Sequence, residues 1–434
     1  MTVIVIIYAL LVALTLAGTR RYPSGPFLLA NAYTLFLTLP AALLFYANHV
    51  VDGAIDYGDY TLDDNIYIAF FCFQAVSLLL SLTLYRWGFR QRERNPIKHF
   101  LAVDSESVAY KRTITVFVFI SVSTLIYVHS AFGFEFILEP RRLYELSRAD
   151  FGSQFFLLGL TLRLAALLVL MSTLKHRQLI FVALLVFSLA TGAKINTYVM
   201  LMFAAAHYVV FRRKARIPIL LLLKLLLIAA PLVYVLISIT FQGVEINIIE
   251  LLIAYVNEPW NNFVLLVQSY SAHFPHLFGG LLTWENNVIS RMPRLLFPDK
   301  PYLFGGFRLA NEYFPDAVAL GIGAPSFGAE GIVYADWGVT GLAMLMIFNG
   351  TCFWLLGRIT AILVRAPQAR RFGFLYFGLL LVLSDFYFLT LPPSNNLLDN
   401  TLIVLALAIT FRIRVVSRRR VGTLAVSDLP TSAA

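Results

Sequence analysis

Charged residues are scarce in this chain of 434 amino acids. Asp, Glu, Lys and Arg make up 13% of it, hydrophobic residues make up 59%, and the mean hydropathy is +0.77. Ordinary soluble domains contain about 25% charged residues. Several apolar stretches also exceed the roughly 18 uncharged residues that a membrane-crossing helix needs. The composition therefore predicts an all-α, polytopic integral membrane protein and excludes an ordinary soluble domain.

The chain is also poor in cysteine and lacks several well-known motifs. Cys72 and Cys352 each sit inside an apolar run, so no disulfide framework and no cysteine-based metal site is indicated. There is no P-loop, dinucleotide-binding fingerprint or HExxH motif, and no inverted repeat of the kind that many secondary transporters have. The net charge of +10 comes mainly from residues beside the apolar runs, so no nucleic-acid partner is expected. We also expect no cofactor and no metal.

The apolar runs predict about eleven transmembrane helices. The first run lacks a basic segment in front of it, so we expect a spanning helix and not a cleaved signal peptide. The predicted spans are residues 2–17, 26–47, 66–85, 113–132, 153–173, 178–191, 197–211, 217–238, 337–356, 372–390 and 397–412. This divides the chain into an N-terminal bundle (1–239), a long loop (240–336), three C-terminal spans (337–412) and a tail (413–434).

The basic residues between the spans predict the sidedness. One side of the alternating connections holds 24 of the 34 Lys and Arg residues. The positive-inside rule assigns that side to the cytoplasm, which places the N-terminus outside and the C-terminus inside. The arginine-rich segment 412–420 is then expected at the inner membrane face, where it contacts anionic membrane lipids. The long loop and a shorter loop, 134–152, face outside.

The shorter outer loop carries arginines on a predicted helix. Pro140 can open a helix, and Arg141, Tyr144 and Arg148 then follow on one face. One interpretation is a solvated helix with local ion pairs. In the other, Arg142 or Arg148 turns inward and holds phosphate through paired N–H donors. The sequence leaves both open.

The predicted spans also give approximate positions for two further cations, Arg163 and Lys194. Arg163 lies ten residues into the fifth span, which is about 15 Å deep at ~1.5 Å per residue. An unpaired charge there costs at least about 2.5–3.5 kcal/mol, so Arg163 is expected to line a cavity or to pair with Asp385. Lys194 lies in a tight outer turn and faces either the same cavity or solvent.

The long outer segment is aromatic, punctuated by proline and glycine, and basic. Residues 248–274 have helical apolar spacing, interrupted at Pro259. Trp260, Tyr255 and Tyr270 are expected at the outer membrane interface. Its cations are Arg291, Arg294, Lys300 and Arg308. A basic, partly apolar platform at an outer bilayer surface suggests a site for an anionic, lipid-borne substrate.

Two carboxylates lie at the mouth of the ninth span. Glu330 and Asp336 are six residues apart in a glycine-rich segment. A carboxylate near a water-poor membrane surface can act as a general base. The alternative is an acid at a helix start that interacts favourably with the helix dipole. We predict Glu330 as the base, with Asp336 behind it. Asn349 begins a glycosylation sequon, but it lies within a span, where the match is attributed to chance.

Two of these segments carry a family resemblance. RLLFPDKP (294–301) and GAEGIVYADWGVTG (328–341) resemble segments of bacterial oligosaccharide repeat-unit polymerases of the Wzy, or O-antigen polymerase, type. The resemblance includes the layout of about a dozen spans, a large periplasmic loop containing short interfacial helices, and an earlier arginine-bearing loop. It implies an inner-membrane glycosyltransferase with a periplasmic active site. The donor would be a glycan on undecaprenyl pyrophosphate, and the acceptor would be a repeat unit on the same carrier.

The same resemblance implies roles for the cations. The family uses arginines in its two periplasmic loops, which match Arg142, Arg148, Arg291 and Arg294 by region. Fixed cations stabilise the negative charge that develops on a departing pyrophosphate lipid, and they can take the place of a metal. The candidate pyrophosphate- or substrate-binding residues are Arg142, Arg148, Arg163, Lys194, Arg291, Arg294 and Arg308.

Partners and alternatives follow from the implied reaction. A chain-length regulator and a flippase are the expected protein partners. An O-antigen ligase, which would move the finished glycan to lipid A-core, is one alternative function. A lipid-linked oligosaccharide flippase or other transporter is the other, because transporters bind substrates near the midplane, where Arg163 is predicted.

Overall fold

The computed structural model describes residues 2–17, 23–91, 99–102, 108–137, 140–192, 194–213, 248–289, 292, 297–299, 301, 303–319, 325–365 and 414–417. Several predictions lie outside this part of the chain. They concern the eighth, tenth and eleventh spans, Arg291, Arg294, Lys300, Asp385 and the tail beyond residue 417.

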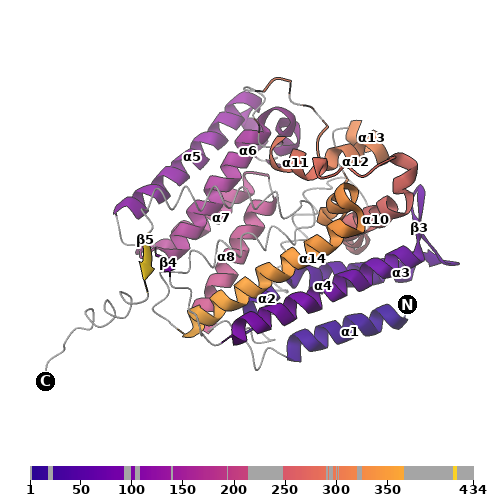
Figure 1. Cartoon of the computed structure of the whole chain (residues 1–434). Helices are drawn as coiled ribbons and strands as arrows, with labels where there is room; N and C mark the ends of the chain where they lie inside the picture. The colour runs from indigo at the N-terminus through magenta and orange to yellow at the C-terminus, as the bar shows by residue number, and fades with distance from the viewer. Residues whose placement is uncertain are drawn as a thin grey trace.

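The described chain is mainly helical (Figure 1). Before the long loop, the helices are α1 (Thr2–Ala17), α2 (Gly25–Ala30), the π-helical turn η1 (Thr34–Thr38), α3 (Leu39–His49), α4 (Asp64–Arg90), α5 (Val108–Phe132), the 3₁₀ turn η2 (Phe134–Ile137), α6 (Pro140–Met171), α7 (Arg177–Leu189) and α8 (Lys194–Arg213). The later helices are α10 (Ile248–His273), α11 (Leu281–Asn287), α12 (Gly306–Tyr313), α13 (Pro315–Ala319) and α14 (Gly328–Arg365).

Membrane-length helices agree with the predicted class. Within the described residues, three helices are long and apolar enough to cross a membrane: Asp64–Arg90, Tyr110–Phe132 and Gly328–Val364. Shorter apolar helices cover Ile4–Ala17, Leu157–Met171, Arg177–Leu189 and Val199–Val209. The helical, membrane-type fold is thus confirmed, while the count of about eleven spans stays a prediction.

Two predicted spans take an unexpected form. Residues 26–47 form α2, η1 and α3 instead of one regular helix. In the other case, Pro140 does begin a helix, but that helix continues for 32 residues through the predicted fifth span. The arginine-bearing part of the short outer loop is therefore the first section of α6.

Five short strands depart from the all-α prediction. β1 (Val50–Val51), β2 (Ala54–Tyr57) and β3 (Tyr60–Asp63) form an antiparallel meander between α3 and α4. The Asp63 side chain then caps α4 by accepting from the Ile66 N–H at 3.1 Å. β4 (His99–Ala102) pairs with β5 (Arg414–Ser417), so two segments that the charge pattern assigns to the same side lie together. These strands were not predicted, because the helical spacing of apolar residues gives no information on tight turns or on which strands pair.

Helices α4 and α14 lie side by side along much of their length (Figure 1). Glycines permit this approach, because a Cβ at Gly88 would overlap the Trp354 carbonyl and a Cβ at Gly357 would overlap the Tyr85 carbonyl. The two helices run in the same direction, as the alternating sidedness of the third and ninth predicted spans requires.

A sharp reversal divides α14 into two arms, which we call the first arm (328–337) and the second arm (339–365). Gly338 has φ 62° and ψ −146°, a conformation that strains any residue with a Cβ. The chain folds back so closely that a Cβ at Gly341 would overlap the carbonyl of Val333. In a straight helix, residues eight positions apart would be separated by about 12 Å.

The reversal also frees backbone carbonyls for other partners. Ala335 and Asp336 would bond to N–H groups four residues ahead in a continuous helix. Instead, the Phe278 N–H donates to the Ala335 carbonyl at 3.0 Å, and the Gly279 N–H donates to the Asp336 carbonyl at 2.8 Å. The segment between α10 and α11 is thereby docked on the end of the first arm.

We expect the substitution Gly338→Ala to destabilise the protein by about 1–3 kcal/mol, because a Cβ is strained at this backbone conformation. The measurement is the thermal unfolding temperature of the purified protein in detergent. Gly350→Ala is the matched control in the same helix, because its added Cβ would displace only the flexible end of Leu84 and would make ordinary van der Waals contact with Leu80. Equal unfolding temperatures for the two variants would contradict the assigned reversal.

Candidate functional site

The predicted base, Glu330, lies in the first turn of α14. Its Oε1 accepts a hydrogen bond from Nε2 of Gln74, on α4, at 2.7 Å. Gln74 is 9% exposed, so this bond joins the two helices in the interior of the bundle. Within the described part of the chain, the carboxylate is held by a neutral amide and not by a cation.

Glu330 and Gln74 line a small interior cavity of about 20 Å³, which we call the polar cavity. Its polar lining comes from η1, α4 and both arms of α14: Thr34, Thr38, Gln74, Ser77, Glu330 and Asn349. Phe70, Leu78, Pro259 and Trp260 complete the wall. A volume of this order accommodates about one water-sized group.

Three features of the backbone contribute to the polar cavity. The π-helical turn η1 places Thr34 and Thr38 on the cavity wall. Pro259 lies inside α10 and lacks the N–H that would continue the helical ladder. The reversal at Gly338 brings Glu330 beside Asn349, although a straight helix would separate residues 19 positions apart by about 28 Å. Irregular helix geometry of this kind is frequent at functional sites.

Polar side chains of α10 fix the segment that leads into Glu330. Glu258 accepts from the Ser326 N–H at 3.1 Å, and the Asn262 amide donates to the Ser326 carbonyl at 2.9 Å. The Tyr57 hydroxyl donates to the Asn262 side-chain oxygen at 2.9 Å. Burial raises the pKa of Glu258 above its ordinary value, while the Ser326 hydrogen bond acts in the opposite direction. The start of α14 is therefore attached to α10 and, through Tyr57, to the meander.

The predicted contact of Trp260 with the membrane interface is wrong, because the side chain is buried in the protein. The residue is 3% exposed, and its ring lies 4.4 Å from that of Phe70 and 5.8 Å from that of Tyr67, measured between centroids. Tyr270 is also buried, at 9% exposure. The helix is not interrupted at Pro259 either, since α10 continues through it. Because α10 packs against α4, its aromatic face points into the protein and not toward a membrane surface.

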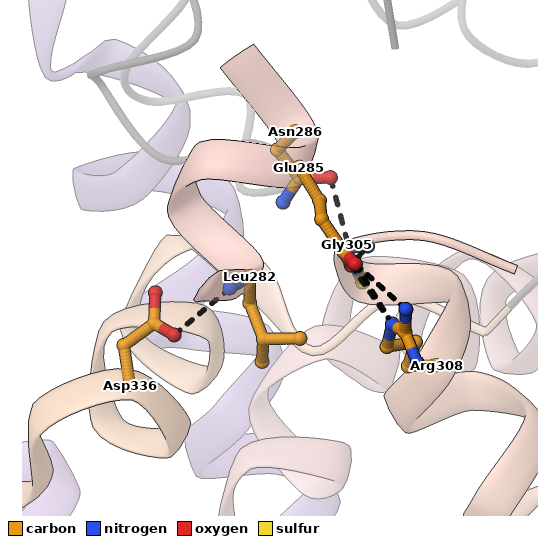
Figure 2. Close-up of polar contacts among 7 residues, drawn as sticks. Leu282, Glu285, Asn286, Gly305, Arg308 and Asp336 are labelled. Carbon is orange, nitrogen blue, oxygen red and sulfur yellow. Dashed lines mark hydrogen bonds and ion pairs between the residues drawn. The ribbon is translucent and has the colours of Figure 1, made fainter. Parts of the chain in front are cut away.

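Asp336 has a different environment from Glu330. Its two carboxylate oxygens accept from the backbone N–H groups of Leu282 and Thr283, at 3.0 and 2.8 Å, as Figure 2 shows for Leu282. These N–H groups belong to the first turn of α11, where a helix has no internal acceptors. Asp336 is fully buried. Its carboxylate thus anchors α11 to the first arm of α14.

The other end of α11 carries an ion pair with Arg308 (Figure 2). Nε and Nη2 of Arg308 donate to the Glu285 carboxylate at 2.7–3.1 Å, and the Gly305 N–H donates to the same carboxylate at 2.6 Å. The hydrogen bonds to Glu285 raise the pKa of the Arg308 guanidinium, so it stays protonated. The Arg308 side chain is 41% exposed and Glu285 only 6%. Arg308 therefore neutralises a buried acid while keeping an outward surface.

The remaining predicted cations lie apart from the polar cavity or outside the described side chains. Arg163 donates from Nε to the Gly159 carbonyl within α6 at 3.1 Å, and it is not among the described residues that line the cavity. Arg142 and Arg148 lie on α6, and Lys194 is the first residue of α8, but the structure describes none of their side chains.

Sequence reasoning missed most of the cavity wall. Gln74, Thr34 and Thr38 are neutral polar residues within apolar segments, and Asn349 drew attention only as a sequon. Polar residues within predicted spans could have indicated a site, because a polar group in an apolar interior costs free energy unless it is hydrogen-bonded. That signal does not reveal which of them share one cavity.

We expect Asp336→Ala to lower the free energy of unfolding by about 1–3 kcal/mol, because two buried N–H groups lose their acceptor. Asp336→Asn keeps one acceptor oxygen and should cost less. Thermal unfolding and activity measured on both variants test this, and the loss of activity should follow the loss of stability. An Asp336→Asn protein that is fully stable yet inactive would instead indicate a catalytic base.

Comparison with known proteins adds an independent observation. No protein-family model matches the chain, and no solved structure matches it. Two proteins named O-antigen polymerase, from Salmonella typhimurium and Salmonella typhi, are each 34% identical to it over 209 residues. The match covers 47% of this chain and 49% of each relative, so the chain spans about half the length of the curated relatives that it matches. Together with the apolar helices, this indicates a multi-pass membrane protein and confirms the resemblance to Wzy-type O-antigen polymerases over that half.

Proposed function

We propose that this protein is a glycosyltransferase that polymerises undecaprenyl-pyrophosphate-linked oligosaccharide repeat units into O-antigen or a related surface polysaccharide. The observation that carries the proposal is the 34% identity to two O-antigen polymerases. The protein lies in the bacterial inner membrane, with its N-terminus in the periplasm and its C-terminus in the cytoplasm. The loop 240–336 forms the periplasmic roof between the bundles 1–239 and 337–412.

The proposed reaction is a displacement at the anomeric carbon of the donor glycan. A hydroxyl oxygen of the acceptor repeat unit forms a bond to that carbon. The bond from the carbon to the pyrophosphate oxygen breaks, and the lipid pyrophosphate leaves with the electron pair. The proton of the attacking hydroxyl passes to the Glu330 carboxylate. The reaction is balanced without an oxidant or a reductant.

The geometry supports Glu330 as the base. Its carboxylate meets the Gln74 amide and no described arginine or lysine, so it is not neutralised by an ion pair. The other acids nearby are committed to the fold, since Asp336 binds the start of α11 and Glu285 binds Arg308. Glu330 is thus the carboxylate that opens on a cavity.

In this proposal, the cations bind the leaving group. Arg291 and Arg294 of the roof hold the departing pyrophosphate, because their attraction for it grows as the bond breaks. Arg142, Arg148, Arg163, Lys194 and Arg308 are the additional candidates for pyrophosphate or substrate binding. The proposed reaction is metal-independent, with these cations in the place of a divalent ion.

We expect Glu330→Gln to lower kcat for chain elongation by about 100-fold or more, because the amide cannot accept the proton. The assay is elongation by the purified protein supplied with lipid-linked repeat units, with products separated by length. Glu312→Gln, a change at a 45% exposed acid, is the control and should leave the rate unchanged. Normal elongation by Glu330→Gln would show that the base is assigned wrongly. A product joined to lipid A-core would indicate a ligase, and movement without transfer would indicate a transporter.

The double variant Arg291→Ala and Arg294→Ala should lower kcat by about 10²–10³-fold, through lost stabilisation of the developing charge. The same elongation assay measures it. Lys175→Ala, an exposed residue in the turn before α7, is the control for removal of a positive charge. Full activity in the double variant would exclude these two arginines from binding the leaving group.

A further inference from the structure

Four residues that line the polar cavity each carry a buried polar atom without a partner in the described part of the chain. Within the described part of the chain, no hydrogen bond reaches Oγ1 of Thr34, Oγ1 of Thr38, Nε1 of Trp260 or Oδ1 of Asn349. These residues are 3, 2, 3 and 6% exposed. Buried polar groups are nearly always hydrogen-bonded, and leaving them unpaired costs free energy. Each of these atoms exposes less than 1 Å², so a polar group from outside the chain, bound in the cavity, would satisfy them once the side chains turn toward it.

The charge of the lining limits what that group can be. Glu330 is the one charged residue among the described lining residues, which include no lysine, arginine or histidine. A phosphate or carboxylate would meet a carboxylate with no cation to offset the repulsion. The described lining therefore favours a neutral group over the pyrophosphate of a lipid-linked sugar.

The unpartnered atoms are of both kinds. Trp260 Nε1 is a donor only, Asn349 Oδ1 is an acceptor, and the threonine hydroxyls can act as either. A neutral hydroxyl group both donates and accepts, so it can bond to atoms of each kind at once. The volume of about 20 Å³ holds one such group and not a sugar ring.

We infer that the polar cavity is an acceptor subsite that takes a single hydroxyl or hydroxymethyl group of the acceptor saccharide and presents it to Glu330. This inference rests on the proposed function. The neutral acceptor is bound at the cavity, while the anionic donor is bound by arginines elsewhere. The subsite residues are Thr34, Thr38, Trp260 and Asn349, and Gln74 positions the carboxylate.

Thr38→Val is the most informative change, because valine has nearly the shape of threonine without its hydroxyl. Removal of a buried hydroxyl that has no partner should leave the unfolding temperature equal or higher. Loss of a subsite bond should instead raise the KM for the acceptor by about 3- to 10-fold. A residue with a purely structural role would not combine these two effects. Thr34→Val is the second variant, and it should behave in the same way.

The assay must separate acceptor from donor. Lipid-linked repeat units serve as the donor, and the acceptor probe is the phosphate-free oligosaccharide released from the same units by mild acid. The probe cannot act as a donor, because it lacks the leaving group. We expect Thr38→Val to change the KM of the lipid-linked donor less than twofold. Ser81→Ala is the matched control, since Ser81 is a fully buried hydroxyl on α4 with no partner in the described chain and lies outside the cavity.

Equilibrium binding of the phosphate-free oligosaccharide, measured by calorimetry on the intact protein, separates the two proposals. If the wild type elongates chains but Thr38→Val and Thr34→Val keep the wild-type acceptor KM, the subsite is wrong and the function stands. If the wild type does not elongate chains but binds the probe with an affinity that Thr38→Val weakens, the function is wrong and the saccharide site stands. Absence of both transfer and binding by the wild type would overturn both.

Discussion

The reversal of α14 at Gly338 is the constraint on which the site depends. Only a backbone without a Cβ adopts its φ and ψ without strain, and the resulting fold-back sets Glu330 beside Asn349. The same break frees two carbonyls that accept from Phe278 and Gly279. One glycine thus brings Glu330 to the polar cavity and docks the segment between α10 and α11 on the end of the first arm.

Acids in this protein are distinguished by their partners. Glu285 is nearly buried and is bound by Arg308, so its charge is balanced and its role is to hold α12 against α11. Asp336 is balanced by backbone N–H groups. Glu330 has a neutral amide instead, which fixes its position without cancelling its charge. A base needs that combination, since an arginine at the same distance would compete with the substrate proton for the carboxylate.

Polar groups that lack partners carry a cost in an apolar interior. Four of them lie on residues that line the polar cavity, whose wall includes the π-helical turn η1 and Pro259. A better-packed bundle would fill this space with apolar side chains. Polar groups left without partners beside a π-helical turn fit a wall whose residues are determined by binding and not by stability.

The sequence by itself determined the class of the protein and most of the described helices, and it singled out Glu330 as the candidate base. Apolar runs and helix starts such as Pro140 depend on neighbours within a few turns, so α1, α4, α5 and the start of α6 could be predicted. Glu330 stood out because an acid in a glycine-rich segment at the mouth of a span carries a strong local signal. Only the tertiary structure decided that Trp260 is buried, that Asp336 anchors a helix, and that residues from η1, α4, α10 and α14 share a cavity. Those outcomes depend on contacts between residues far apart in the chain, and the spacing of residues along a sequence does not encode which distant side chains will meet.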